Sequence, residues 1–163
     1  MTMKQHHERD DDERTWLEHV LTHDIPLGGA MEVRVVRLDE AGVELALPLD
    51  ANVNDKGTAF GGALASAMIL AGWSLPRLLM RRAELKAELV IGRCEIRFTR
   101  PVDGAFTALC PWPAADDCER FVRRLAHSGR ASLVLAPEIR ADGELAATLS
   151  AKYAALGNPG NPK

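Results

Sequence analysis

The sequence contains few aromatic residues, few cysteines and no large excess of either charge. Its 163 residues include only three Trp, one Tyr and four Phe, so a core must be built mainly from aliphatic side chains. The chain is 47% hydrophobic, and its length suits one domain. A net charge of −3 argues against nucleic acid as a partner, because nucleic-acid-binding proteins usually present a basic face.

The three cysteines are widely spaced and do not form a recognisable ligand or disulfide pattern. Cys94, Cys110 and Cys118 include no CxxC pair, and no cluster of histidines accompanies them. Structural zinc sites and disulfide frameworks need ligands or partners at characteristic spacings. The sequence therefore predicts reduced thiols in a cytoplasmic protein, with neither a metal nor a cofactor.

Only one long segment, 59–75, is almost free of polar side chains. Its 17 residues lie at the lower limit of the roughly 17–25 that cross a membrane, and it contains several Gly and Ser residues. We interpret it as a wholly buried helix and expect no membrane insertion. Residues 1–13 are polar and lack the apolar stretch of a signal peptide, so we expect a disordered N-terminus, a domain over 14–156 and a flexible tail over 157–163.

The order of the expected elements indicates the fold class. A helix that is apolar on all sides must be covered on all sides, and a curved antiparallel sheet together with a partner subunit would do so. We therefore predict an α+β hotdog fold, an antiparallel sheet wrapped around a long buried central helix, in a homodimer or higher homo-oligomer. The expected elements are a helix over 16–23, strands over 31–38 and 43–49, the buried helix from 59 that ends or kinks at Pro76, strands over 89–100 and 105–110, a helix over 116–127, and strands over 131–139 and 144–156.

The segment that leads into the buried helix, 54–62, has the composition of an anion-stabilising site. Thr58 is the expected N-cap, and the helix start offers unpaired backbone N–H groups at the positive end of the helix dipole. Gly61 and Gly62 allow a substrate carbonyl to approach these groups closely, and the Asn54 side chain can add a donor. Together they predict an oxyanion hole, in which each donor contributes about 2.7–4 kcal/mol.

The same segment resembles the start of the central helix in hotdog acyl-CoA thioesterases, which carry an Asn followed by His-Gly-Gly. The resemblance is closest to the thioesterase-like domain that also occurs fused behind an acetyltransferase-like domain. It implies an enzyme acting on an acyl thioester carried by acyl carrier protein or CoA, and some members of that branch convert malonyl-ACP to acetyl-ACP. The residues that carry the resemblance are Asn-x-x-Gly-Thr-Ala-Phe-Gly-Gly over 54–62, Gly72-Trp73, the stretch 95–102 and Lys152-Tyr153-Ala154.

The chain departs from the thioesterase pattern at two positions. Phe60 replaces the motif's His, and Ile69, nine positions later, replaces the acidic residue that acts as base or nucleophile. Gly62, Ser66, Ile69 and Trp73 share one helix face. Decarboxylation of a malonyl thioester leaves an enolate, and a resident acid would oppose the substrate carboxylate by about 4 kcal/mol at ~4 Å and an effective dielectric of 20. The departures therefore favour decarboxylation over hydrolysis.

Several alternatives remain open from the sequence. Asp55 is the leading candidate base if the enzyme hydrolyses its substrate, and a third possibility is a non-catalytic acyl-binding module. Asn54 is alternatively a turn residue that bonds its own loop, and Ser66 a helix residue bonded to the carbonyl four positions back. The candidate catalytic residues are Asn54, Gly61 and Gly62, and the candidate substrate-binding residues are Asp55, Thr58, Phe60, Ser66, Ile69 and Trp73.

Arginines are concentrated in the second half of this otherwise acidic chain. They form either a solvated face with local ion pairs or a docking surface for an acidic carrier protein or for CoA phosphates. The residues are Arg93, Arg97, Arg100, Arg120, Arg123, Arg124 and Arg130.

Overall fold

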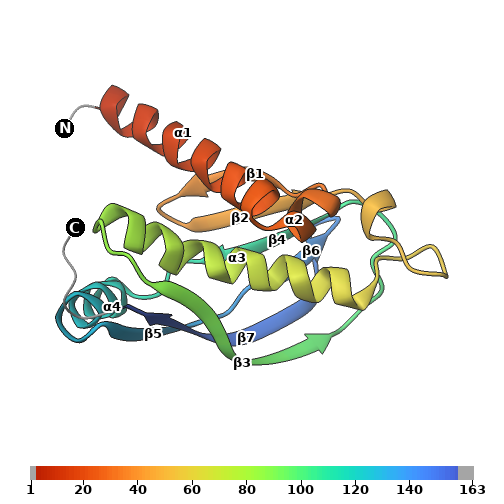
Figure 1. Ribbon diagram of the computed structural model, residues 1–163. Coiled ribbons are helices and arrows are strands. Elements are labelled where there is room, and N and C mark those ends of the chain that lie inside the picture. The colour runs from red at the N-terminus through yellow and green to blue at the C-terminus, as the bar shows by residue number, and fades with distance from the viewer. Residues whose placement is uncertain (1–2, 158–163) are drawn as a thin grey trace.

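The computed structural model describes residues 3–157. A long helix, α3 (Gly61–Arg82), crosses the middle of the molecule, and a curved antiparallel sheet lies along it (Figure 1). The strand order is β1-β2-β4-β6-β7-β3, and β5 also pairs with β7. The α+β hotdog arrangement is thus confirmed. The strands are β1 (Arg34–Asp39), β2 (Gly42–Leu47), β3 (Glu88–Phe98), β4 (Phe106–Pro111), β5 (Arg130–Leu135), β6 (Glu138–Ala141) and β7 (Glu144–Leu156).

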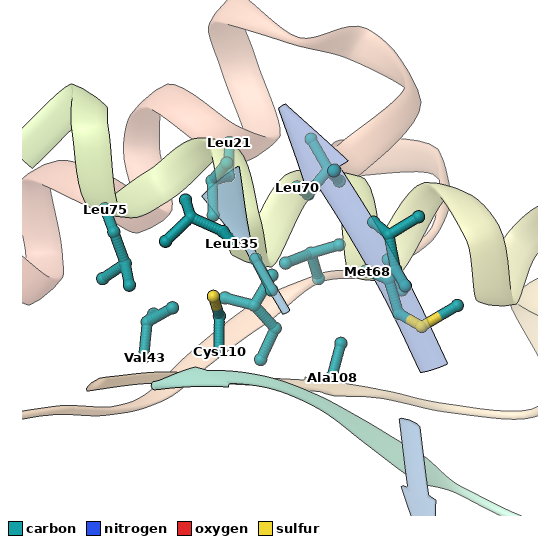
Figure 2. Packing of buried hydrophobic residues seen from close by; sticks show 14 of the residues in the cluster. Leu21, Val43, Met68, Leu70, Leu75, Ala108, Cys110 and Leu135 are labelled. Carbon is teal, nitrogen blue, oxygen red and sulfur yellow. The ribbon is translucent and has the colours of Figure 1, made fainter. Parts of the chain in front are cut away.

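The central helix is buried because its side chains fill the concave face of the sheet. Figure 2 shows Met68 and Leu75 of α3 facing Val43 and Ala108 of β2 and β4, and all four side chains are fully buried. By length and composition α3 could cross a membrane, yet 61% of its most apolar window is buried within the protein. The apolar run is therefore explained by the core of this fold.

Proline at position 76 does not end the central helix. The helix continues to Arg82, although a proline in a helix interior costs about 3 kcal/mol. Pro76 is itself buried, and Leu78 and Met80 beyond it are 0% and 1% exposed. Burial of these side chains against the sheet offsets the local cost. Of the expectation that the helix ends or kinks at Pro76, the end is therefore wrong.

The N-terminal region differs most from the expectation. Residues 3–13, expected to be disordered, belong to helix α1 (Met3–His19), which continues as a π-helical turn, Val20–Asp24. Ion pairs to the end of α3 hold it: Arg82 lies 2.6 Å from Glu13, and Arg81 lies 2.9 Å from Asp12. A local pattern cannot reveal partners 69 residues away. Pro26 opens the short helix α2 (Pro26–Ala30). Of the expected tail, residues 158–163 lie outside the described residues.

The remaining elements follow the expected order, except that one expected strand is divided into two. The first two strands form the predicted hairpin, and a register shift between Ile91 and Arg93 confirms the bulge predicted at Gly92. The single strand expected over 131–139 is two strands, β5 and β6, because Pro137 cannot donate to the ladder. The other elements are η2 (Asp50–Asn52) and helix α4 (Ala115–Ser128), which ends at Gly129 as predicted, with φ 69°.

Strand β3 is an edge strand whose inner face is poorly covered. It pairs only with β7, so its other edge forms no ladder in the described chain. Ile91 and Phe98 face the side of the sheet that carries α3, as their register partners Tyr153 and Ala147 do, yet they are 38% and 54% exposed. The chain therefore leaves apolar surface open beside the central helix.

Candidate functional site

The loop before the central helix is closed by the side chain of Asn54. The Asn54 Oδ1 atom accepts hydrogen bonds from the Lys56 and Thr58 backbone N–H groups at 2.8 and 3.1 Å. Its Nδ2 group donates to Thr58 Oγ1 at 2.8 Å, and its backbone N–H donates to the Thr58 carbonyl at 2.7 Å. Asn54 thus organises its own loop, as the alternative interpretation held, and one Nδ2 hydrogen remains for another acceptor.

Two backbone bonds fix the segment that enters the helix. Ala59 N–H donates to the Val102 carbonyl and Phe60 N–H to the Asn52 carbonyl, both at 2.7 Å. Asn52 is only 3% exposed, and its Nδ2 group donates to the Met31 carbonyl at 3.0 Å. Sequence reasoning did not single out Asn52, because nothing in the run of Asn and Asp residues distinguishes it from its exposed neighbours.

The helix start presents free backbone donors. Helix α3 begins at Gly61, and the N-cap is Phe60, which has no capping side-chain bond. The expectation that Thr58 caps the helix was wrong, because its hydroxyl is bonded to Asn54 instead. The N–H groups of Gly61 and Gly62 donate to no acceptor within residues 3–157. They lie at the positive end of a 22-residue helix, where such groups can bind an anionic oxygen.

Two aromatic rings flank these donors. A Cβ atom built on Gly62 would lie 2.4 Å from the Phe60 ring, and one on Gly61 would lie 3.7 Å from the Phe98 ring. Phe60 and Phe98 are 58% and 54% exposed, so the rings form apolar walls that remain open to solvent. Phe98 was not among the candidate residues. Its place at the end of a strand carries no signal, since the contact joins parts of the chain 37 positions apart.

The predicted helix stripe continues away from the glycines. Ser66, Ile69 and Trp73 are all half-buried, and the Ser66 hydroxyl makes no hydrogen bond to any described residue. Bonding to the carbonyl four positions back is found instead at Ser74. The Ile69 carbonyl accepts a 2.8 Å bond from the hydroxyl of Tyr153. The stripe therefore offers one free hydroxyl and otherwise apolar surface.

Within the described residues, no buried carboxylate lies beside the start of α3. Helix α3 contains no acidic residue. The Asp55 side chain is 84% exposed and pairs with Lys56 at 3.2 Å, and the Glu95 side chain is 71% exposed and pairs with Arg97 at 3.3 Å. Glu13, the buried acid of the described chain, contacts Arg82 at the opposite end of α3. The site thus combines free N–H donors with apolar walls.

Comparison with solved structures shows the same fold in bacterial proteins. A protein of unknown function from Chlorobaculum tepidum is 24% identical with a TM-score of 0.85, covering 91% of this chain and 97% of the other. A putative thioesterase from Shewanella oneidensis is 22% identical with a TM-score of 0.78, covering 90% and 99%. A probable thioesterase from Pseudomonas aeruginosa is 21% identical with a TM-score of 0.75, covering 88% and 95%.

A family model covers nearly the whole described chain. The model described as putative thioesterase (yiiD_Cterm) matches residues 14–157, a span that contains the Asn54 loop, the glycine helix start and all seven strands. The chain therefore belongs to the yiiD_Cterm putative-thioesterase family of the hotdog fold.

Proposed function

We propose that the protein is an enzyme that acts on acyl thioesters, with the Gly61 and Gly62 amides as its oxyanion hole. The free N–H groups at the start of α3 are the observation that carries this proposal. In the proposed site, the N–H groups of Gly61 and Gly62 bind the thioester oxygen, while Asn54 holds the loop in place and offers its remaining Nδ2 hydrogen. Ser66 and Thr58 orient the substrate, and Phe60, Ile69 and Trp73 contact its apolar part.

Within this class, we favour decarboxylation of a malonyl thioester. The bond between the carboxylate carbon and the methylene carbon breaks, CO₂ leaves, and the electron pair becomes an enolate whose charge rests on the thioester oxygen. Protonation of the methylene carbon by water then gives the acetyl thioester. The reaction needs stabilisation of one oxygen and a poorly solvated carboxylate, and the apolar side chains of Phe60, Phe98 and Ile69 suit the second need.

Hydrolysis is the second candidate, favoured by the family's description as a thioesterase. In that reaction Asp55, the acid nearest to the motif, would activate the attacking water. Its carboxylate is solvent-exposed and paired with Lys56, which places it outside an apolar pocket. A non-catalytic acyl-binding module is the third candidate.

One assay separates the three candidates. The protein is incubated in separate reactions with malonyl-ACP and with a panel of acyl-CoA thioesters, and the products are resolved by mass. Acetyl-ACP without free thiol supports decarboxylation, release of free thiol supports hydrolysis, and saturable binding without any product supports a binding module.

The assigned residues are tested by a pair of neighbouring substitutions. We expect Asn54→Ala to lower kcat/KM about 100-fold or more, because it removes the bonds that hold the loop and one donor. Asp55→Asn is the matched variant: it leaves decarboxylation unchanged and abolishes hydrolysis if Asp55 is the base. Full turnover by the Asn54 variant would show that the assignment of Asn54 is wrong.

We also propose that a second copy covers the open edge of β3. Two β3 strands related by a two-fold axis would pair antiparallel, satisfy the unpaired backbone groups and cover apolar side chains such as Ile91. Phe98, which touches the helix start, would then lie near the interface, so that the second copy borders the site. The proposed setting is the cytoplasm, with the thioester carried by an acyl carrier protein or CoA.

A further inference from the structure

Strand β5 has a free edge that forms one wall of a groove. β5 pairs only with β7, and the backbone of residues 131–135 makes no hydrogen bond to any other described segment. Helix α4 runs beside it, since Gly129 alone separates the two elements, and Figure 1 shows them side by side. The groove between them encloses about 330 Å³, and its lining includes Asp117, Arg120, Arg124, Ser132 and Val134.

The helix wall of this groove is cationic. Arg120 and Arg124 are one helical turn apart, so their side chains emerge on the same face of α4. Arg120 pairs with Asp117 at 2.9 Å, but both side chains are about half exposed, and such surface pairs are worth only about 0–1 kcal/mol. Arg124 makes no ion pair with any described residue. The groove therefore keeps a net positive charge.

The strand wall adds an apolar side chain between further cations. Val134 is 60% exposed, the largest exposed fraction among the large hydrophobic side chains of the described chain. Its register partner on β7 is Lys152, which points to the same face of the sheet, and Arg130 opens the strand. Neither cation forms an ion pair within the described residues. An exposed valine on an unpaired edge, with Lys152 as its register neighbour and two arginines on the facing helix, is suited to a partner chain.

We propose that the α4–β5 groove binds an extended acidic segment of a partner polypeptide, which adds as a strand to the free edge of β5. In this mode the backbone of the segment supplies hydrogen bonds, and alternate side chains enter the groove. Its carboxylates face Arg120 and Arg124, and its apolar side chains cover Val134. The inference concerns a surface separate from the thioester site and does not depend on the proposed activity.

A polypeptide fits these observations better than a nucleic acid. A strand edge offers alternating N–H and C=O groups, which another backbone matches and a phosphate backbone does not. The chain as a whole carries a charge of −3, so the long-range field that attracts nucleic acid is absent.

The groove is tested with a fluorescein-labelled peptide of eight residues that alternates glutamate and valine. Titration of the full-length protein, followed by fluorescence anisotropy, is expected to show saturable binding that weakens as NaCl is added. A peptide with proline in place of each valine cannot pair as a strand, so we expect at least about tenfold weaker binding from it. A peptide with lysine in place of glutamate should not bind.

Charge reversal in the groove supplies the matched variants. Arg120→Glu with Arg124→Glu is expected to weaken binding of the glutamate–valine peptide by about tenfold or more. Arg34→Glu, an exposed arginine on β1, should leave it unchanged. Circular dichroism of both variants checks that the fold is retained. Amide shifts in the NMR spectrum should concentrate in residues 130–135 and in α4.

Several results would overturn the proposal. The proposal is wrong if the glutamate–valine peptide does not bind, or if the double variant binds it as tightly as the wild type does. It is also wrong if the proline peptide binds equally well, or if the amide shifts lie outside residues 130–135 and α4. A single-stranded RNA oligonucleotide that binds in place of the peptide, with the same loss in the double variant, would assign the groove to nucleic acid and would likewise reject the proposal.

Discussion

The buried side chain of Tyr153 explains why the neighbouring helix has a glycine at position 72. It is the largest fully buried residue, and its hydroxyl donates to the Ile69 carbonyl of α3 at 2.8 Å. Burial raises the pKa of this hydroxyl, so it stays protonated and remains a donor throughout the physiological range. A Cβ atom on Gly72 would lie 2.4 Å from the same oxygen. The glycine of the Gly72-Trp73 pair is therefore explained by contact with the sheet.

We expect Gly72→Ala to lower the free energy of unfolding by about 1–3 kcal/mol, because the added methyl group displaces Tyr153 from a filled core. Gly104→Ala is the control, since a Cβ atom there meets nothing within 4 Å. Urea denaturation followed by circular dichroism measures both. Equal stability of the two variants would contradict the role given to this contact.

Burial also determines the reactivity of Cys110. It raises the pKa of the Cys110 thiol to about 12, with only a smaller lowering from the Ala136 backbone group that hydrogen-bonds to the sulfur. At pH 8 about one thiol in ten thousand would be ionised, and the thiolate is the reactive form. We expect Cys110 to react with a thiol reagent such as dithionitrobenzoate only after unfolding. Labelling of Cys110 in the folded protein, located by peptide mass, would contradict this.

At the scale of elements, α1 is a largely polar helix that is attached by charges as well as by its buried Leu17. Trp16 lies under the Arg81 and Arg77 guanidinium groups, at 4.3 and 5.4 Å from the ring centre. Burial acts to raise the pKa of Glu13, but the hydrogen bonds and charge of Arg82, with smaller help from other arginines, outweigh it and lower that pKa. The ionised carboxylate therefore stabilises the docked helix.

The pH dependence of this attachment follows from the direction in which the pKa of Glu13 is shifted. Because the pKa of Glu13 is lower in the folded chain than its ordinary value of 4.5, its stabilisation is present above pH 4.5 and is lost as pH falls through the folded-state pKa. We expect Glu13→Gln to reduce the free energy of unfolding by about 1–3 kcal/mol at pH 7 and by less in acid. Glu95→Gln, at an exposed pair, should change it by less than about 0.5 kcal/mol. If the stability lost in Glu13→Gln instead became larger in acid, the stabilising role given to the ionised Glu13 carboxylate would be wrong.

At the scale of the whole molecule, β1 and β3, the first and last strands of the main strand order, differ in what they leave uncovered. The inner side of β3, beside the central helix, exposes apolar side chains that include Ile91 and Phe98. Strand β1, at the other edge, is flanked by α1, and Glu18 of α1 accepts a hydrogen bond from the Val35 backbone N–H at 2.8 Å. An edge protected in this way is a poor interface, so we place the proposed dimer contact on β3.

In analytical ultracentrifugation we expect the wild-type protein to have twice the mass of one chain. We expect Ile91→Asp to have the mass of one chain, because it puts a charge into the proposed interface. Val36→Asp, at a 50% exposed position on β1, is the control and should remain dimeric. A single-chain wild type, or loss of the dimer only in the Val36 variant, would remove the β3 contact from consideration. Activity should fall together with the dimer if the second copy borders the site.

Short-range patterns in the sequence determined the fold class, the first hairpin, the Gly92 bulge and the helix stop at Gly129. The hairpin, the bulge and the helix stop each depend on residues within a few positions of one another, so periodicity and turn chemistry suffice to predict them, and the fold class follows from the order of the elements that these patterns predict. The same holds for the start of the site, since the glycines and the unpaired N–H groups of a helix end are local features.

Only the tertiary structure decided the rest. It kept α3 helical through Pro76, docked helix α1 and moved Phe98 against Gly61. Each of these outcomes is a competition between a local preference and burial or charge supplied by a distant segment. The local preference is visible in the sequence, but the distant partner exists only after the chain has folded, and its contribution of a few kcal/mol is large enough to win.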